Sequence, residues 1–227
     1  MTAPLVALEG VSRRFGRGPT AVQAVRSATL RLCAGEVVVV MGPSGSGKST
    51  LLCLVAGLLH PDAGRAAIAG RSLSALASGE LLHLRRTRVG FVFQHFNLLR
   101  ALSALENVEL GLWLAGRGRR EARRRAAAGL EEVDLAARAH AVPRDLAGGE
   151  QQRVAVARAL APGPDLILAD EPTGSLDAAN GRRVIELICR HTRRAGACSM
   201  LVTHDHRVAD AADRRLWMED GMLRESA

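Results

Sequence analysis

A glycine-rich segment that joins an apolar run to a helix-forming run constrains the fold of this chain most strongly. Residues 42–49 read GPSGSGKS and fit the pattern G-x-x-x-x-G-K-[ST]. The pattern is meaningful when a strand precedes it and a helix follows it, because free backbone N–H groups at the helix start then surround a phosphate. The apolar run 37–41 supplies the strand, and a helix is predicted from residue 48 to about 58. An α/β fold with a phosphate-loop core and a parallel-rich sheet is therefore expected.

Lys48 is the only lysine among the 31 Lys and Arg residues. A composition that favours arginine everywhere else has kept lysine at this one position. A compact ammonium on a flexible stem reaches β- and γ-phosphates as a point charge, whereas the planar guanidinium is wider. Binding of a nucleoside triphosphate is therefore predicted. The residues expected to hold it in this segment are Gly42, Pro43, Ser44, Gly45, Ser46, Gly47, Lys48, Ser49 and Thr50.

A second apolar run ends in paired carboxylates. Residues 166–169 are predicted to form a buried strand that delivers Asp170 and Glu171 at its end. In phosphate-loop enzymes, a hydroxyl of the loop and such an aspartate hold Mg²⁺ between them. In this chain these two residues are Ser49 and Asp170. Glu171 is not needed for the metal and is placed to polarise water as a general base.

The order of the expected elements indicates one domain with an inserted helical part. Strands are expected at 5–11, 28–32, 37–41, 89–93, 166–169 and 199–203, and helices at 48–58, 78–86 and 179–194. Residues 98–159 look mainly helical, with interruptions at 116–120 and 143–145. The domain is therefore divided into a nucleotide-binding core, residues 1–94 and 161–227, and a helical subdomain, approximately residues 95–160.

A third motif identifies a family. Residues 146–153 read LAGGEQQR, Gln94 follows an expected strand, the triplet SLD at 175–177 follows the paired carboxylates, and His204 ends the last expected strand. These motifs, in this order, resemble those of the ATP-binding-cassette ATPases, whose signature is usually written L-S-G-G-Q or L-S-G-G-E. The resemblance covers nearly the whole chain. The stretches 91–99, 105–108 and 169–177 look most like the subgroup that contains the lipoprotein-release, macrolide-export and cell-division ATPases.

The resemblance implies a fold, a cofactor pair and a partner. The fold is a phosphate-loop core with an N-terminal antiparallel β part, the cofactors are ATP and Mg²⁺, and two copies close head to tail around the nucleotides. Gly148 and Gly149 of one copy would then approach the γ-phosphate bound by the other, at a helix start where no side chain blocks the backbone. Asp177 would lie at the seam between the copies. Phe15 matches the position of an aromatic residue that stacks on adenine.

The resemblance also assigns catalytic roles and shows one departure. Glu171 would act as the base, His204 would contact the γ-phosphate, and Gln94 would sense Mg²⁺ and the attacking water. The serine of the family's signature is Ala147 here. Because that serine is expected to bond the γ-phosphate, a slower but working ATPase is the hypothesis.

The expected partner is a separate transmembrane permease. The apolar runs are far shorter than the roughly 20 residues of a membrane span, and no signal peptide is visible. The chain is therefore expected to be cytoplasmic, peripheral on the inner face of the membrane through its permease, and to drive export or membrane extraction. Its four cysteines lack C-x-x-C spacing and are expected to be small buried residues.

Three other functions stay open at this point. One is a cell-division-type ATPase of the same subgroup, and a second is a weakly hydrolysing regulatory subunit, which Ala147 favours. The third is an ATPase directed to nucleic acid, which the arginines at 117, 119, 120, 123, 124 and 125 and a net charge of +8 favour. Only 100 positions separate Lys48 from Gly148, which leaves no room for the inserts of DNA-repair relatives, so no nucleic acid is expected as a partner.

Overall fold

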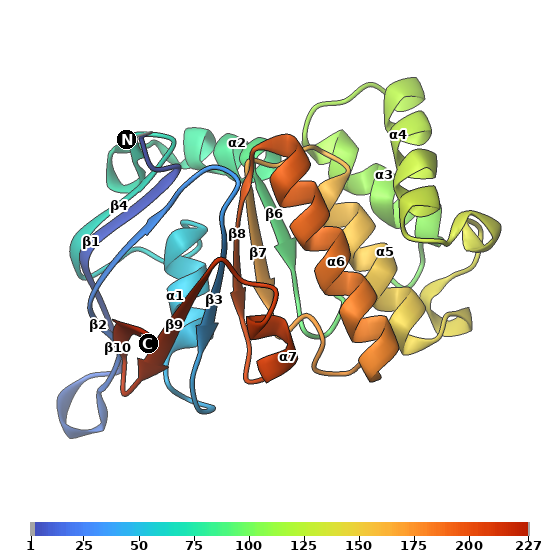
Figure 1. Ribbon diagram of the computed structural model, residues 1–227. Helices are drawn as coiled ribbons and strands as arrows, with labels where there is room; N and C mark the ends of the chain where they lie inside the picture. Colours follow the sequence, from blue (N-terminus) through green and yellow to red (C-terminus); the bar gives the residue numbers. More distant parts are fainter. Residues whose placement is uncertain (1–2, 227) are drawn as a thin grey trace.

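Two β-sheets and a set of helices make up the computed structural model, which describes residues 3–226. Residues 1, 2 and 227 of the predicted domain division lie outside the described residues. The first sheet is antiparallel, with the order β2-β1-β4-β5, and lies to the left in Figure 1. Its strands are β1 (Val6–Phe15), β2 (Val22–Leu32), β4 (Ala63–Ile68) and β5 (Arg71–Ser72).

The second sheet places the phosphate loop. Its order is β10-β9-β3-β8-β7-β6, and all neighbours are parallel except the antiparallel pair β9–β10. The strands are β3 (Val37–Met41), β6 (Val89–Val92), β7 (Leu166–Asp170), β8 (Cys198–Val202), β9 (Arg214–Glu219) and β10 (Met222–Glu225). Since parallel strands end at one edge, the residues after β3, β6, β7 and β8 meet there, at the bottom of Figure 1.

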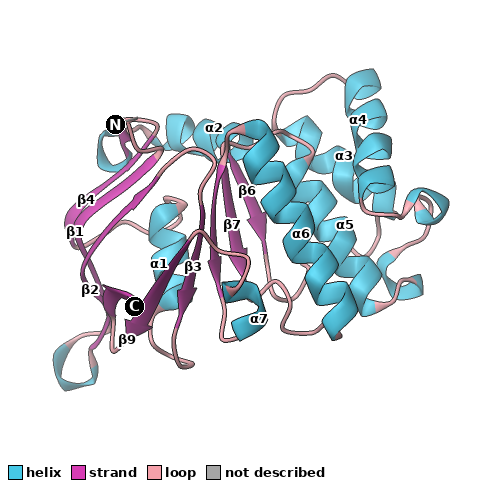
Figure 2. Cartoon of the chain, in the orientation of Figure 1, coloured by secondary structure: helices cyan, strands magenta, loops and turns pink. Residues whose placement is uncertain are grey.

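The helices lie on both sides of this sheet, as the colours of Figure 2 show. They are α1 (Lys48–Val55), α2 (Ser78–Arg88), α3 (Ala104–Leu114), α4 (Arg119–Glu132), α5 (Gly148–Leu160), α6 (Ala178–Ala195) and the short α7 (His206–Ala209). Single turns of 3-10 helix lie in the connections at Gly18–Thr20, Leu73–Ala75, Ala136–Arg138 and Pro143–Asp145.

The central sheet separates two hydrophobic cores. Because side chains alternate along a strand, Val37 and Val39 of β3 face the core shared with α3 to α6. Val38 and Val40 face the core shared with α1, α2 and the antiparallel sheet. All four valines are at most 1% exposed. This two-sided burial fixes the strand from which the phosphate loop starts.

The predicted α/β class, with its parallel-rich sheet and N-terminal antiparallel part, is confirmed. Several predicted bounds are wrong. The helix expected over 48–58 ends at Val55, and the one expected from 98 begins at Ala104, where Ser103 caps it. The strands expected at 5–11 and 28–32 extend to Phe15 and begin at Val22, because the added residues of β1 and β2 pair with each other as a largely exposed ribbon.

Two further properties bear on the expectations. Within residues 3–226, no helix is both long and apolar enough to cross a lipid bilayer. Cys189 and Cys198 are buried, as expected, and burial raises the pKa of the Cys198 thiol to about 12. Cys33 and Cys53 are only half-buried, so the expectation of burial is wrong for them.

Candidate nucleotide site

The loop between β3 and α1 can be closed only with glycine at two of its positions. Gly42 has φ +148°, and an added Cβ would lie 1.9 Å from the carbonyl oxygen of Met218. Gly47, which caps α1, has φ +104°, and its Cβ would lie 2.0 Å from the carbonyl oxygen of Ala24. The loop therefore packs directly against the backbone of β2 and β9. This packing fixes the curved arrangement of its N–H groups at the start of α1.

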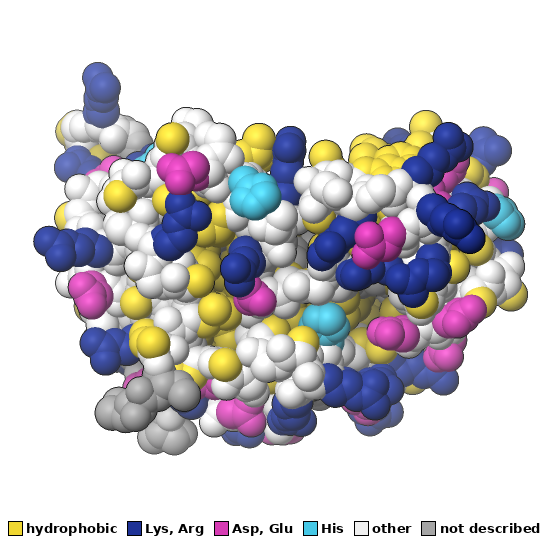
Figure 3. Space-filling model, turned by 90° about the horizontal axis from the view of Figure 1, so that it is seen from above, with side chains coloured by type: hydrophobic (Ala, Val, Ile, Leu, Met, Phe, Trp, Pro, Cys, Tyr) yellow, Lys and Arg dark blue, Asp and Glu magenta, His cyan; other side chains and the backbone are white. Residues whose placement is uncertain are grey.

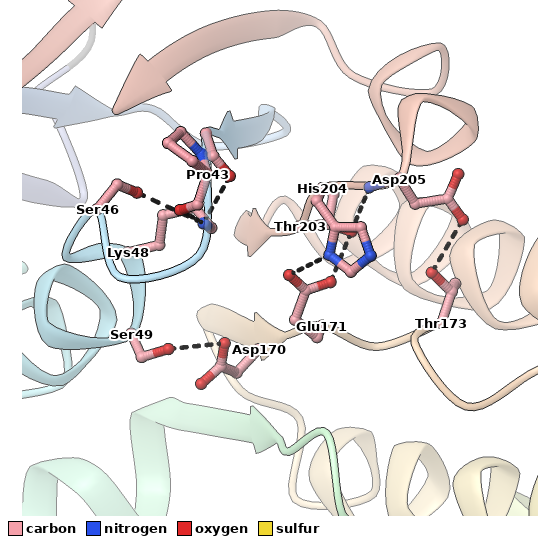
Figure 4. Close-up of polar contacts among 11 residues, drawn as sticks. Pro43, Ser46, Lys48, Ser49, Asp170, Glu171, Thr173, Thr203, His204 and Asp205 are labelled. Atoms are coloured by element: carbon pink, nitrogen blue, oxygen red, sulfur yellow. Dashed lines mark hydrogen bonds and ion pairs between the residues drawn. The ribbon is translucent and has the colours of Figure 1, made fainter. Parts of the chain in front are cut away.

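Lys48 is the first residue of α1, and its ammonium lies inside the loop (Figure 4). Its Nζ donates to the carbonyl oxygens of Gly42 and Pro43, both at 2.8 Å, and lies 3.5 Å from Ser46 Oγ. Burial lowers the pKa of Lys48, and the carboxylates of Glu171 and Asp170 partly oppose that shift. An ammonium has three protons, so after two short hydrogen bonds one proton is left for a phosphate oxygen.

Ser49 and Asp170 face each other across the loop. Ser49 Oγ donates to Asp170 Oδ1 at 3.1 Å. Burial raises the pKa of Asp170, and the hydrogen bond from Ser49 opposes that effect. A hydroxyl and a carboxylate at this spacing suit Mg²⁺, which takes one or two protein oxygens and completes its shell with phosphate and water. The described residues contain no group of three or more His, Cys, Asp or Glu that would bind a metal without such help.

Glu171 is held in a strained and well-defined position. Its φ of +44° is unusual for a residue with a side chain. Thr203 Oγ1 donates to Glu171 Oε2 at 3.0 Å, and the Nδ1 atom of His204 lies 2.8 Å from Oε1. Figure 4 shows that these contacts turn the carboxylate away from Asp170. Each carboxylate oxygen keeps a lone pair for a further contact, and the exposed ring of His204 has no second hydrogen bond, at Nε2, among the described residues.

One open cavity of about 620 Å³ collects most of the predicted site residues. Those lining it are Phe15, Ser44, Gly45, Gly47, Lys48, Ser49, Thr50, Gln94, Asp170 and Glu171. Phe15 lies at its rim with 41% of its surface exposed, and the guanidinium of Arg13 sits 5.1 Å from the ring centre. A half-exposed aromatic ring beside a phosphate loop is suited to stack on a base.

Seven predicted residues are not part of this lining. Gly42, Pro43 and Ser46 belong to the loop itself, and His204 contacts Glu171, whereas the other three lie elsewhere on the chain. Gly148 and Gly149 begin α5, and Asp177 caps α6 by accepting hydrogen bonds from the N–H groups of Ala179 and Asn180. These hydrogen bonds lower the pKa of Asp177. The two helix starts are tied together, because Asn180 accepts from Arg153 of α5 at 2.7 Å and donates to Asp177 at 2.6 Å. They form a second surface on the same chain.

Comparisons with known proteins decide the family. A sequence model of the family described as "ABC transporter" matches residues 25–174, which is more than half of the chain. The chain belongs to the ABC transporter family. The matched range contains the phosphate loop, the signature glycines and both carboxylates.

Similar members of the ABC transporter family include the macrolide export ATP-binding/permease protein MacB of Sodalis glossinidius, at 45% identity, and that of Agrobacterium fabrum, at 44%. Each alignment covers 98% of this chain and 34% of the relative. The chain therefore spans about a third of the length of these relatives. A dimeric structure of the ATP-binding cassette MJ0796 in a post-hydrolysis state with ADP and Pi is 40% identical, with a TM-score of 0.90. That match covers 97% of this chain and 98% of the solved one.

Some residues of the site were not predicted. Thr203 follows β8 directly and precedes His204, so its place after an apolar run was a usable signal. Asn180 gave no such signal, because it belongs to no motif, and Arg153, although it ends the stretch 146–153, gave no sign of its contact with Asn180. The contact between Glu171 and His204, which are 33 positions apart, also depends on the strand order.

Proposed function

We propose that this chain is an ATP-hydrolysing nucleotide-binding subunit, of which two copies close around ATP and drive a membrane permease. The observation that carries the proposal is the division of the site. Lys48, Asp170 and Glu171 line one cavity, whereas Gly148 and Asp177 lie on a separate surface at two helix starts. A single chain therefore has each half of a nucleotide site but not both halves in contact.

Closure of two copies would complete each site. The N-terminus of α5, with free N–H groups at Gly148 and Gly149, provides a positive end for the γ-phosphate held by the partner's loop. The dimeric state of the solved cassette supports this arrangement. Asp177 would then lie at the seam, and Asn180 would keep it in register with the signature helix.

The hydrolytic step uses residues already in contact. Glu171 accepts a proton from water, while Thr203 and His204 hold its carboxylate in one orientation. Lys48, the loop N–H groups and the free nitrogen of His204 would stabilise charge on the γ-phosphate. Ser49 and Asp170, with Gln94 nearby, would hold Mg²⁺, which supplies further neutralisation of phosphate charge when bound.

The rest of the proposal concerns the assembly. The chain would sit at the cytoplasmic face of a membrane, bound to a permease through the helical subdomain of residues 95–160. The names of its relatives favour export. A weakly hydrolysing regulatory subunit is the second candidate, because Ala147 leaves α5 without a hydroxyl at its cap.

Affinity capture tests the proposal. Tagged Glu171→Gln protein is incubated with native membranes and ATP, with ADP as the control. ATP-dependent recovery of a polytopic membrane protein is expected. Recovery of nucleic acid, or of soluble proteins alone, would contradict the proposal.

A further inference from the structure

A second cavity lies near the amino ends of the central strands, opposite the strand ends at which the nucleotide site lies. It measures about 590 Å³ and lies between α4, α5 and α6. Gly163 and Ala195, which line it, precede β7 and β8, so it opens at the amino ends of the parallel strands. The phosphate loop follows the carboxyl end of β3. The cavity is therefore separate from the nucleotide site.

Arginines surround this cavity. Arg124 and Arg125 come from α4, and Arg190 and Arg194 come from α6. Among the described residues, Arg124, Arg190 and Arg194 form no salt bridge, while Arg125 pairs with Glu121 at 2.8 Å. Glu132 is the only carboxylate among the lining residues. Figure 3, which looks onto this end of the sheet, shows Lys and Arg side chains gathered around a hollow over the helical half.

Contacts within α4 explain only one of its two arginines at the cavity, because Arg125 pairs with Glu121 one turn before it, whereas Arg124 has no salt-bridge partner among the described residues. Basic residues stabilise the C-terminal turn of a helix and oppose the dipole near its N-terminus. Arg194 fits this rule, since it lies in the last turn of α6. Arg124 and Arg125 lie in the middle of α4, beyond its first turn and before its last, so the dipole accounts for neither of them. Their position brings them to the same cavity as the two arginines of α6.

The floor of the cavity is apolar and built from small residues. Ala128, Gly129 and Ala161 leave space that Leu160 and Leu187 line with aliphatic carbon. One polar group interrupts this floor. The Nε2 atom of His191 is buried and has no hydrogen-bond partner among the described residues. Burial lowers the pKa of His191, which favours the neutral imidazole.

We infer that this cavity binds an amphipathic anion whose phosphate or carboxylate group contacts the arginines and whose apolar body lies on the floor. Unpaired guanidinium groups are preferred partners of phosphate and carboxylate. The volume lies within the range of small-molecule sites, and an apolar floor with few polar groups is typical of them. The inference does not depend on ATP hydrolysis, because no lining residue belongs to the nucleotide site.

The anion can come from two sources, a soluble amphiphile or the headgroup region of an anionic lipid. Calorimetric titration of the full chain with monomeric decyl phosphate tests the shared chemistry, and inorganic phosphate serves as the control for the apolar part. The test variant is Arg124→Gln/Arg194→Gln. The matched control is Arg120→Gln/Arg183→Gln, which removes two exposed arginines from the same helices but outside the cavity.

Saturable one-to-one binding of decyl phosphate is expected. The test pair should weaken it by at least about tenfold, since two charge-assisted contacts are lost, and the control pair by less than about twofold. A third variant, Ala128→Trp, keeps the charge and fills the floor, and it should also weaken binding. Equal weakening by both arginine pairs, no saturable binding, or equally tight binding of inorganic phosphate would overturn the inference.

A sedimentation assay with phosphatidylglycerol vesicles distinguishes the sources. Co-sedimentation that the test pair abolishes and the control pair keeps would assign the site to bilayer lipid. Binding of decyl phosphate without any vesicle binding would assign it to a soluble amphiphile. Vesicle binding that both pairs reduce equally would overturn the inference, because it would reflect net charge alone.

Discussion

The start of α5 offers a direct test of the account, through the substitution Ala147→Ser. Ala147 occupies the N-cap position, where its N–H donates to Glu150 Oε2 at 2.8 Å, but it has no side-chain acceptor. The same chain shows the complete version of this motif at α3. There Ser103 accepts from the N–H of Glu106 at 3.3 Å and its own N–H donates to Glu106 at 2.8 Å. Ala147→Ser should add the missing hydrogen bond of this motif, in which a hydroxyl at the cap accepts from the N–H of Glu150.

The expected gain follows from this comparison. Restoring an N-cap hydroxyl stabilises a protein by about 1 kcal/mol, which raises Tm by about 2–4 °C for a chain of this length. If the hydroxyl also bonds the γ-phosphate in the closed dimer, it adds about 1.5–3 kcal/mol in the transition state. Turnover should then rise roughly ten- to hundredfold. Calorimetric unfolding without nucleotide and steady-state ATP hydrolysis measure the two effects separately.

Ala77→Ser is the matched control. Ala77 caps α2 with the same half of the motif, since its N–H donates to Glu80 Oε2 at 3.0 Å, and it lies outside the nucleotide cavity. It should raise Tm by a similar amount and leave turnover unchanged. A gain in Tm for Ala77→Ser but none for Ala147→Ser would refute the capping argument. An Ala147→Ser enzyme that is more stable but no faster would show that the signature hydroxyl has no catalytic role here.

Three further predictions concern the nucleotide cavity. Phe15→Ala should weaken ATP binding by about tenfold in a titration, because a stacked ring is lost. Phe15→Trp should bind ATP as well as the unsubstituted chain does. Equal loss of affinity in both variants would contradict the stacking role. Gly47→Ala should lower the free energy of unfolding, measured with denaturant, by at least about 2 kcal/mol. Gly45→Ala should lower it less, since the added Cβ would meet nothing within 4 Å. Equal losses would show that the close approach of Gly47 to Ala24 is unimportant. Because its pKa is raised, the carboxylate of Asp170 protonates at a higher pH than an exposed carboxylate does. The Mg²⁺-dependent affinity for ATP should therefore be complete at neutral pH and fall at mildly acidic pH. An affinity that does not change with pH would argue against Asp170 as a metal ligand.

Much of the nucleotide cavity was predictable because its motifs are short and continuous. The phosphate loop lies in one continuous segment, between an apolar run that forms a strand and a run that forms a helix. The buried strands β3 and β7 were found for the same reason, since β3 is uniformly apolar up to Gly42 and β7 is uniformly apolar up to Asp170. Glu171 was singled out because it follows Asp170 directly.

Two strands that lie next to the sheet edges, β4 and β9, were missed for physical reasons. β4 reads AGRAAI, in which Ile68 is the only β-branched residue, so its pairing with β1 decides its conformation. β9 alternates between exposed and buried side chains, with Leu216 and Met218 inward, but its arginines and glutamate obscure the short pattern. The tie between Arg153 and Asn180 links residues 27 positions apart across two helices, and no local pattern records such a contact.

In the proposed mechanism, the two halves of the nucleotide site meet only when two copies close around ATP. Light scattering from the Glu171→Gln protein in solution, with ATP and with ADP, measures this closure as a change in mass. Since the carboxylate base is removed while the binding residues remain, ATP should persist and the mass should double with ATP but not with ADP. A monomer under both conditions, with ATP binding intact and with turnover close to that of the unsubstituted chain, would contradict both the closed dimer and the role of Glu171.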